Sequence, residues 1–374
     1  MALSLTDDQV RRLRMRAQWL DGRPHDGGVA AIAGAVVGIQ AQATAAADYS
    51  LRARGTGLTV ADVKRAVVDD RSVVRTWCMR GTLHLVAAED LQWLLPVLAP
   101  TAIHRSRRRM QQLGLDAGAA ERGIRRLAEV LADGAPRTRA DLAAALAHDD
   151  IPLEGQALPH LVRYAALRGV ICNGPLRGGK DTYVPCDAWL GSAPGDPPED
   201  GLARLAGRYL AAYGPASLDD FAYWSGLPKG MAGQGWDAVI HETVDVDVAA
   251  RWDADLEAWV SELNFAVAGE SRSLVRLLGM FDAYLLGYRR RGLALAPEHA
   301  HRLVPGTGGM IRAALLVDGR VRGVWTTRRS GGSLEILVEP FGKLPADVRR
   351  GVEAEVEGIG RFLDVPATLR TGRT

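Results

Sequence analysis

The chain is poor in the residues that build disulfide and zinc sites. Its 374 residues include only three cysteines, Cys78, Cys172 and Cys186, and no two of them form a CxxC pair. A disulfide framework is therefore excluded, and a cysteine-rich zinc site is not expected. The closely spaced His299 and His301 fall in a predicted loop. We therefore expect no bound metal.

Long apolar runs and several enzyme motifs are also missing. No stretch reaches the roughly 18 uncharged apolar residues of a membrane helix. The N-terminus has no basic segment ahead of an apolar core, so we expect no signal peptide, no membrane contact and a cytoplasmic protein. The sequence contains no P-loop, no GxGxxG after a strand, no HExxH and no GxSxG. We therefore expect no cofactor.

Lysine is scarce, and the charges nearly balance. The formal net charge is +2, so a nucleic-acid surface would require local segregation of charge. Among 46 basic residues, the lysines are Lys64, Lys180, Lys229 and Lys343. A GC-rich genome explains this bias, yet arginine can bind phosphate bidentately and lysine cannot. Few residues remain that could form a Schiff base.

A helix-start pattern recurs along the chain. A hydroxyl residue followed three positions later by aspartate is typical of a helix N-cap. The pattern begins at Thr59, Thr138 and Ser217, which are 79 residues apart each time. Thr6 and Gln9 form a further predicted capping box. The equal spacing indicates three related modules.

The order of predicted elements defines the fold class. In the middle module, helices over residues 119–132, 139–147 and 155–168 precede a hairpin, which is the order of a winged helix. The third module follows the same order, and the first is irregular. After residue 264 the chain is rich in strands and ends in a helix. We expect an α+β protein of three tandem winged-helix motifs and a β-rich, barrel-like C-terminal domain.

Domain boundaries follow from composition. Residues 191–200, rich in proline, glycine and acidic side chains, read as a linker. The expected units are the N-terminal helices with the first module, the middle module, the third module and the β-rich domain, over residues 1–110, 111–190, 201–262 and 263–374.

Two amides interrupt an otherwise small and apolar segment. Gln40 and Gln42 lie between Ala30 and Ala47. On a helix, side chains two positions apart diverge, whereas on an extended segment they point the same way. The two amides converge only if the helix breaks near Ala41, and they could then hold one water molecule. The alternative is that both amides cap or bridge helix ends.

Four segments together resemble a known family. Gln40-Ala-Gln42 is similar to the Gln-aliphatic-Gln motif of the AlkZ/YcaQ DNA glycosylases. The runs RTWCMRGTLHL (75–85), FDAYLLGYR (281–289) and LVDGRVRGVW (316–325) resemble further segments of that family, in the same order. The resemblance covers nearly the whole chain. Gln42 indicates the AlkZ branch, because YcaQ-like members carry aspartate there. The small Ala41 departs from larger aliphatic residues at the middle position.

The resemblance implies cleavage of the N-glycosidic bond of N-alkylated purines, in repair or in self-resistance to a DNA-alkylating natural product. It also implies unhooking of interstrand crosslinks. An N7-alkylated guanine is cationic and leaves readily, so the enzyme must mainly place a water and stabilise an oxocarbenium-like sugar. We expect Gln42 to orient that water and Gln40 to fix the water or the sugar, although the roles could be exchanged. After the glutamine segment, the first lysine in the sequence is Lys64, so no lysine amine lies close to the glutamines along the chain. This favours a monofunctional glycosylase, without lyase activity.

The expected partner is double-stranded DNA bound by a monomer. Arg80 and His84 follow the glutamines in a matched segment, so we assign them to the lesion pocket, with core pairing as the alternative. The other predicted DNA contacts lie on the recognition helix and wing of the middle module and beside a C-terminal hairpin: Arg163, Arg168, Arg177, Lys180, Arg328 and Arg329.

Two other functions remain open at this level. A winged-helix transcription regulator would be expected to dimerise and to read base edges from its recognition helix. A degenerate family member would bind alkylated DNA without cutting it.

Overall fold

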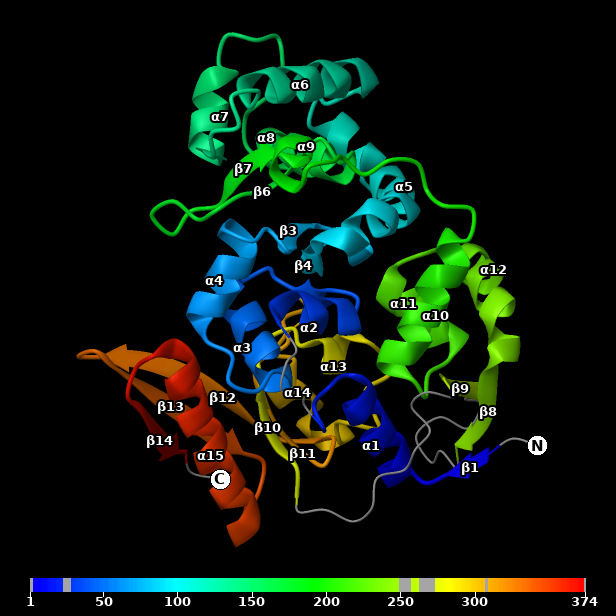
Figure 1. The fold of residues 1–374 in the computed structure, drawn as a ribbon, viewed down its shortest axis with the longest axis vertical. Coiled ribbons are helices and arrows are strands. Elements are labelled where there is room, and N and C mark those ends of the chain that lie inside the picture. Colours follow the sequence, from blue (N-terminus) through cyan, green and yellow to red (C-terminus); the bar gives the residue numbers. More distant parts are fainter. Residues whose placement is uncertain (1–2, 23–27, 249–256, 262–272, 307–308, 373–374) are drawn as a thin grey trace.

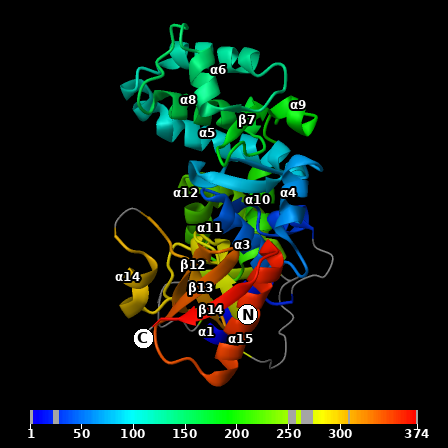
Figure 2. The same ribbon diagram turned by 90° about the vertical axis from the view of Figure 1, so that its left-hand side faces the viewer.

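The computed structural model describes residues 3–22, 28–248, 257–261, 273–306 and 309–372. The fold is mixed α+β, as expected. In Figure 1 the middle module forms one end of the long axis, the first module lies at the centre with the third module beside it, and the C-terminal half occupies the other end. Figure 2, turned by 90°, shows the same separation of the middle module.

The first module follows a capped N-terminal helix and ends in a long helix that crosses to the middle module. The hairpin β3–β4 joins α4 to α5, and the short strand β2 pairs with β4. The bounds are α1 (Asp7–Ala17), α2 (Val29–Ala35), β2 (Ile39–Gln40), α3 (Thr44–Arg54), α4 (Val60–Val68), β3 (Val73–Trp77), the 3-10 turn η1 (Met79–Gly81), β4 (Leu83–Ala87) and α5 (Ala88–Gln112).

The middle module has the predicted order of three helices and a hairpin. A short strand, β5, also pairs with β7. Its helix α8 carries a row of buried apolar side chains that pack against α6. The bounds are α6 (Ala117–Val130), β5 (Arg137–Thr138), α7 (Arg139–Ala145), α8 (Ala157–Leu167), β6 (Ile171–Asn173), β7 (Thr182–Pro185) and α9 (Cys186–Leu190).

The third module lies beside the first and shares a core with it. An aromatic cluster of Tyr209, Tyr213, Phe221 and Trp224 packs against apolar residues of α2 and β4. The N-terminal strand β1 pairs in parallel with β8, so the start of the chain joins this module in space. The bounds are β1 (Leu3–Leu5), α10 (Gly201–Tyr213), α11 (Leu218–Ser225), α12 (Lys229–Val239), η2 (Ile240–Glu242), β8 (Thr243–Val248) and β9 (Glu257–Ser261).

The C-terminal half contains a five-stranded sheet with α15 packed on one face. Valines of α15 form a core with the inward side chains of the sheet. The bounds are β10 (Val275–Leu278), α13 (Ala283–Leu286), η4 (Pro297–His299), α14 (Ala300–Leu303), β11 (Ala314–Val317), β12 (Arg320–Ser330), β13 (Ser333–Pro340), α15 (Ala346–Leu363) and β14 (Ala367–Thr371).

The expectation of a barrel-like C-terminal domain is wrong. The strand order is β10-β11-β12-β13-β14, and the two outer strands do not pair with each other. A barrel would close this sheet on itself and turn one face into its interior. Here α15 covers that face, so an open sheet buries its apolar side without closing.

The predicted helix starts are confirmed. Capping boxes are formed at Thr6, Thr59, Thr138 and Ser217. In the first module, however, the capped helix α4 leads straight into β3, whereas in the other two the capped helix is followed by another helix. The number of winged helices and the domain boundaries remain predictions.

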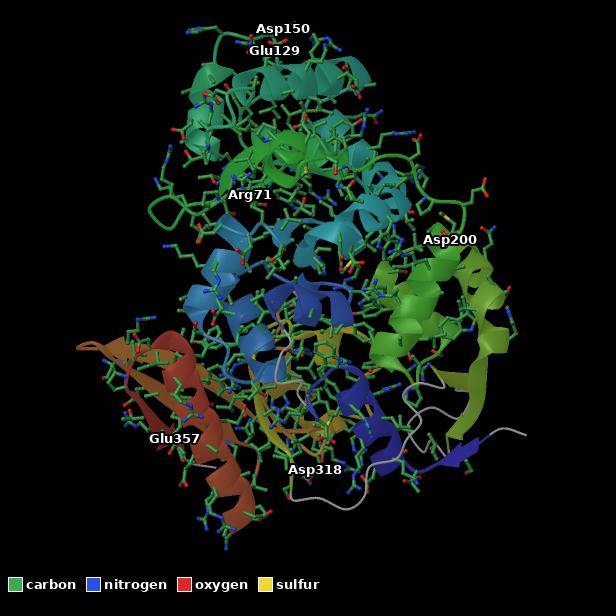
Figure 3. All side chains as sticks on the ribbon, in the orientation of Figure 1. Arg71, Glu129, Asp150, Asp200, Asp318 and Glu357 are labelled. Carbon is green, nitrogen blue, oxygen red and sulfur yellow. The ribbon has the colours of Figure 1, made fainter. Side chains whose placement is uncertain are left out.

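One sheet joins the first and middle modules, which the sequence did not indicate. Its strand order is β2-β4-β3-β6-β7-β5, and Arg75 of β3 pairs with Asn173 of β6. A second link is Arg71, which lies where the two modules meet (Figure 3). Its guanidinium carbon lies 4.1 Å from the ring centroid of Trp189, and Nη1 donates to the Trp189 carbonyl at 3.3 Å.

Candidate active site

Gln40 ends the short strand β2, and Gln42 lies in the bend that follows it. Helix α2 ends at Ala35, and Val37 and Gly38 then take φ values of 55° and 102°. A Cβ on Gly38 would lie 2.9 Å from the methyl carbon of Met79, so glycine fits this turn closely. The chain leaves the turn as β2 and pairs with β4. The predicted break therefore occurs, slightly before Ala41.

Gln40 is held by an arginine. It is 9% exposed and lies opposite His84 in the β2–β4 pairing. Nη2 of Arg80 donates to Oε1 of Gln40 at 3.0 Å, and Nη1 donates to the carbonyl of Trp224 at 2.6 Å. Arg80 thus connects the first glutamine to the end of α11.

Gln42 is exposed and is held by the backbone. The N–H of Leu83 donates to Oε1 of Gln42 at 2.8 Å. Because both glutamines meet a donor, the amide oxygen must face that donor in each case, which fixes the orientation of both groups. The oxygens are therefore anchored on the segment from Arg80 to Leu83, and no hydrogen bond of either Nε2 to a described residue is found.

Arg80 occupies a strained and crowded position. Its φ is 55°, in the left-handed region that few non-glycine residues adopt. A Cβ on Gly226, which ends α11, would lie 3.1 Å from the Arg80 Cα. Burial lowers the pKa of the Arg80 guanidinium below its ordinary value of 12.5. Strain at such a position is common at functional sites, where the surrounding structure maintains it.

His84 is a buried and neutral imidazole. Burial, followed by the charge of Arg80, lowers its pKa to about 3. Its Nδ1 lies 2.9 Å from the carbonyl of Thr82, so Nδ1 carries the proton and donates. Nε2 therefore holds the lone pair, on the same face of the sheet as Gln40.

Of the predicted DNA contacts in the middle module, only Arg163 joins this group. Its Nε donates to the carbonyl of Gly81 at 3.2 Å, next to Arg80. Arg168 and Arg177 are exposed and form ion pairs with Glu121 and Asp141.

The remaining predicted contacts lie on exposed turns. Lys180 lies in the turn between β6 and β7 and lines a cavity of about 580 Å³ on the middle module. Arg328 and Arg329 are exposed beside the tip of the β12–β13 hairpin, where Ser330 pairs with Ser333.

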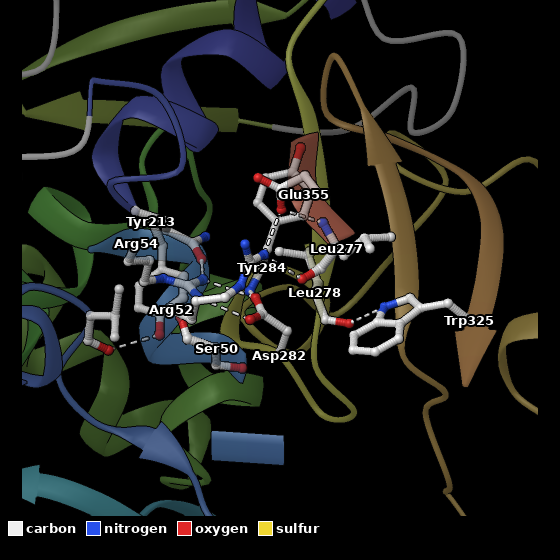
Figure 4. A network of polar contacts seen from close by, with 12 residues as sticks. Ser50, Arg52, Arg54, Tyr213, Leu277, Leu278, Asp282, Tyr284, Trp325 and Glu355 are labelled. Carbon is white, nitrogen blue, oxygen red and sulfur yellow. Dashed lines mark hydrogen bonds and ion pairs between the residues drawn. The ribbon is translucent and has the colours of Figure 1, made fainter. Parts of the chain in front are cut away.

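The C-terminal half anchors the helix that follows Gln42. At the end of α3, Nη1 and Nη2 of Arg54 each donate to a carboxylate oxygen of Asp282 at 2.8 Å, and both side chains are fully buried (Figure 4). Two residues earlier, Arg52 donates to Glu355 of α15 at 2.5 Å. Asp282 is far from the glutamines in sequence, but its pair with Arg54 holds the helix that follows Gln42.

Sequence reasoning missed several residues around the glutamines. The carbonyl of Trp224 in α11 accepts from Arg80, and Gly226, just after α11, leaves room for the Arg80 backbone. Arg75 donates from Nε to the Ala41 carbonyl at 2.8 Å. Lys64 lies far from Ala41 in sequence, but both line one cavity of about 280 Å³. Of these residues, only Arg75 lies in a segment that resembled the family, the run over residues 75–85.

Within the residues that the structure describes, no three histidine, cysteine, aspartate or glutamate side chains gather as a metal site. No helix in the described ranges has the length and hydropathy to cross a membrane.

Comparisons with known proteins place the chain. A family profile described as DNA glycosylase AlkZ-like matches residues 33–362. A relative from Streptomyces sahachiroi, "Interstrand DNA cross-link repair glycosylase", is 30% identical over 364 residues, which cover 94% of this chain and 95% of the relative. The solved structure of Streptomyces sahachiroi DNA glycosylase AlkZ superposes with a TM-score of 0.82 at 29% identity, covering 99% of this chain and 100% of that one. The chain therefore belongs to the AlkZ-like family and is a DNA glycosylase.

Proposed function

We propose that this enzyme hydrolyses the N-glycosidic bond of N7-alkylated, cationic purines in double-stranded DNA. In this reaction the oxygen of water bonds to C1′ of the deoxyribose while the bond from C1′ to N9 breaks. The electron pair moves to N9, the base leaves as a neutral molecule, and the proton of the water passes to solvent. Because the leaving group is already cationic, little acid catalysis is required.

The main support is the fixed orientation of the exposed Gln42. Its Oε1 accepts one bond from Leu83 and keeps a second lone pair, and its Nε2 has no described partner. The amide can therefore accept from and donate to one water molecule. Gln40 is less exposed and bonded to Arg80, which suits a positioning role. We accordingly assign water orientation to Gln42 and support of that site to Gln40.

His84 and Arg80 complete the proposed lesion pocket. A cationic base would be repelled by an imidazolium, but the pKa of His84 is about 3, so its ring stays neutral. Arg80 remains a cation, and its two terminal nitrogens are directed to Gln40 and Trp224. We infer that Arg80 supports the glutamine, while His84 can accept a hydrogen bond from the substrate or its water.

The decisive experiment measures abasic sites formed in a duplex that contains N7-methylguanine. We expect the native protein to form them and Gln42→Ala to lose this product while keeping DNA binding. Gln40→Ala should show a smaller or equal loss. Binding without any product from the native protein would instead support a binding-only member or a regulator.

We further propose that the enzyme unhooks interstrand crosslinks and acts as a monomer. The name of the Streptomyces sahachiroi relative describes it as an interstrand DNA cross-link repair glycosylase. Crosslinked and singly alkylated duplexes, compared at equal concentration, test this activity and separate a general repair enzyme from a dedicated self-resistance enzyme. Light scattering during size exclusion tests the monomer.

Monofunctional chemistry needs a separate test, because Lys64 is nearer to the glutamine segment than its sequence position indicated. Lys64 lines the cavity on the Ala41 side of the strand, whereas Gln40 lies on the other face. We expect no covalent adduct when borohydride is added to the reaction. An adduct that disappears in Lys64→Ala would show a lyase step.

A further inference from the structure

The turn between β3 and β4 carries the anchors of both glutamines. Its Arg80 donates to Gln40. The N–H of Leu83, which follows the turn, donates to Gln42. Arg80 and Gly81 both lie in the left-handed region, with φ values of 55° and 67°. Two such residues in succession, one of them not glycine, persist only where the surrounding structure holds them. The position of both amides therefore depends on what fixes this turn.

Among the described residues, the hydrogen bonds within this turn leave the carbonyl of Gly81 to a partner from outside. The N–H of Gly81 donates to the Cys78 carbonyl at 2.8 Å, and the N–H of Thr82 donates to the Met79 carbonyl at 3.1 Å. The N–H of Cys78 donates back to the Thr82 carbonyl at 2.9 Å. The Gly81 carbonyl accepts from Nε of Arg163 on α8, at 3.2 Å. A side chain of the middle module thus completes the bonding of the turn.

The contact between Arg163 and the turn is close. A Cβ on Gly81 would collide with Nη2 of Arg163, so the guanidinium lies directly against this stretch of backbone. The same Cβ would lie 3.6 Å from the Cβ of Ala102 on α5. The preceding residue of the turn, Arg80, meets Gly226 at the end of α11. Elements of the middle and third modules therefore both contact the turn that carries the glutamine anchors.

Arg163 has no acidic partner in the part of the chain that the structure describes. Arg168, on the same helix, pairs with Glu121, whereas the hydrogen bond of Arg163 goes to a backbone carbonyl. The Arg163 side chain is half-buried, and this burial lowers the pKa of its guanidinium below the ordinary value of 12.5. Burying a charge without an opposite charge is costly. The stability of the middle module therefore does not account for an arginine at this position.

We propose that Arg163 is a positioning residue, which fixes the orientation of Gln40 and Gln42 by holding the Gly81 carbonyl. The inference rests on the proposed roles of the two glutamines in catalysis. A small misplacement of a positioning group lowers the rate by up to about 100-fold, so the loss of this bond should slow the chemical step. A phosphate contact, which is expected from a recognition helix, would instead act on the affinity for DNA. The middle module thus contributes to the reaction rate and not to binding alone.

Two uncharged variants of the intact protein separate the hydrogen bond from the charge. The amide nitrogen of Arg163→Gln stands at the same place along the side chain as Nε of arginine and can donate to Gly81, whereas Arg163→Met has a similar length and no donor. Excision of N7-methylguanine at saturating enzyme gives the rate of the chemical step, and duplex titrations give the affinity and its salt dependence.

We expect Arg163→Met to lose about 10- to 100-fold in rate and Arg163→Gln to keep most of the native rate. Neither variant should change the slope of log K against log salt. Arg122→Met alters an exposed arginine on α6 of the same module and should match the native protein in every measurement. Melting curves verify that each variant is folded.

The outcomes separate this proposal from the reaction itself. Equal losses of rate in the two variants, or a salt slope that decreases by about one in both, would show that Arg163 acts through its charge on a DNA phosphate. Amide hydrogen exchange over residues 79–83 gives a measurement without catalysis, and it should be faster in Arg163→Met than in the native protein or Arg163→Gln. Native-like exchange in Arg163→Met would overturn the proposal. If the native protein does not cut the duplex, the proposed reaction fails, while exchange still decides whether Arg163 holds the turn.

Discussion

The guanidinium of Arg80 lies 3.0 Å from Oε1 of Gln40, 40 positions earlier in the sequence. The same guanidinium reaches the carbonyl of Trp224, so residues of the first and third modules meet at one side chain. The glutamine motif therefore depends on packing between modules. Changes far from residue 40 in the sequence should affect catalysis.

Replacing Arg80 should reduce turnover more than DNA binding. Arg80→Met keeps the length of the side chain but removes both donors, so Gln40 loses its anchor. A small misplacement of a positioning group costs up to about 100-fold in rate. We expect kcat to fall by about 10- to 100-fold, with a much smaller change in the affinity for duplex DNA.

The Arg80 prediction has a matched control. Arg65→Met alters an exposed arginine of α4 that pairs with Asp62, so activity should be retained. A proportional loss of duplex affinity in Arg80→Met would indicate that Arg80 contacts DNA directly.

His84 should make the protein less stable in acid. Its pKa in the folded protein, about 3, lies below the ordinary value of 6.5, so the unfolded chain binds the extra proton between these values. The resulting stability is fully present above about pH 6.5 and is lost as the pH falls toward 3.

His84→Asn should therefore flatten the dependence of unfolding free energy on pH in that interval. Urea titrations of both proteins from pH 4 to 7 measure the difference. Parallel curves would contradict a buried neutral imidazole. Activity of the native enzyme should show no inflection from His84 between pH 5 and 8.

The buried pair of Arg54 and Asp282 should be essential for stability. Asp282→Asn leaves the Arg54 charge without its partner in a site from which water is excluded. Breaking such a pair costs about 3–5 kcal/mol. Denaturant unfolding should show that loss, whereas Glu129→Gln, which breaks the exposed pair with Arg126, should cost less than about 1 kcal/mol. Similar losses of unfolding free energy for both variants would contradict the expectation that the buried pair contributes more than the exposed one.

The β12–β13 hairpin should contribute to DNA affinity through charge. Arg328→Ala combined with Arg329→Ala removes two exposed cations near its tip. If both meet phosphates, the slope of log K against log salt should decrease by about two. The same double change at Arg349 and Arg350 on α15 is the control. Equal slopes for the two double variants would exclude the hairpin from the DNA interface.

The sequence by itself determined the local elements and the family. Capped helix starts at Thr59 and Thr138, and the turn at Ser330, follow from hydrogen bonds between residues that are neighbours along the chain, so their patterns are readable there. The spacing also showed that the two amides could converge only if the helix broke near Ala41, and α2 does end before them. The matched motifs then identified a glycosylase.

Only the tertiary structure decided what surrounds those glutamines. The Arg80–Trp224 bond, the joint β3–β6 sheet and the open C-terminal sheet depend on how helices and strands pack. Packing also places Asp48, Lys64 and Ala41 in the lining of one cavity. Local patterns reflect the backbone's own hydrogen bonds, whereas these contacts arise from burying apolar faces against distant segments, which composition and spacing do not encode.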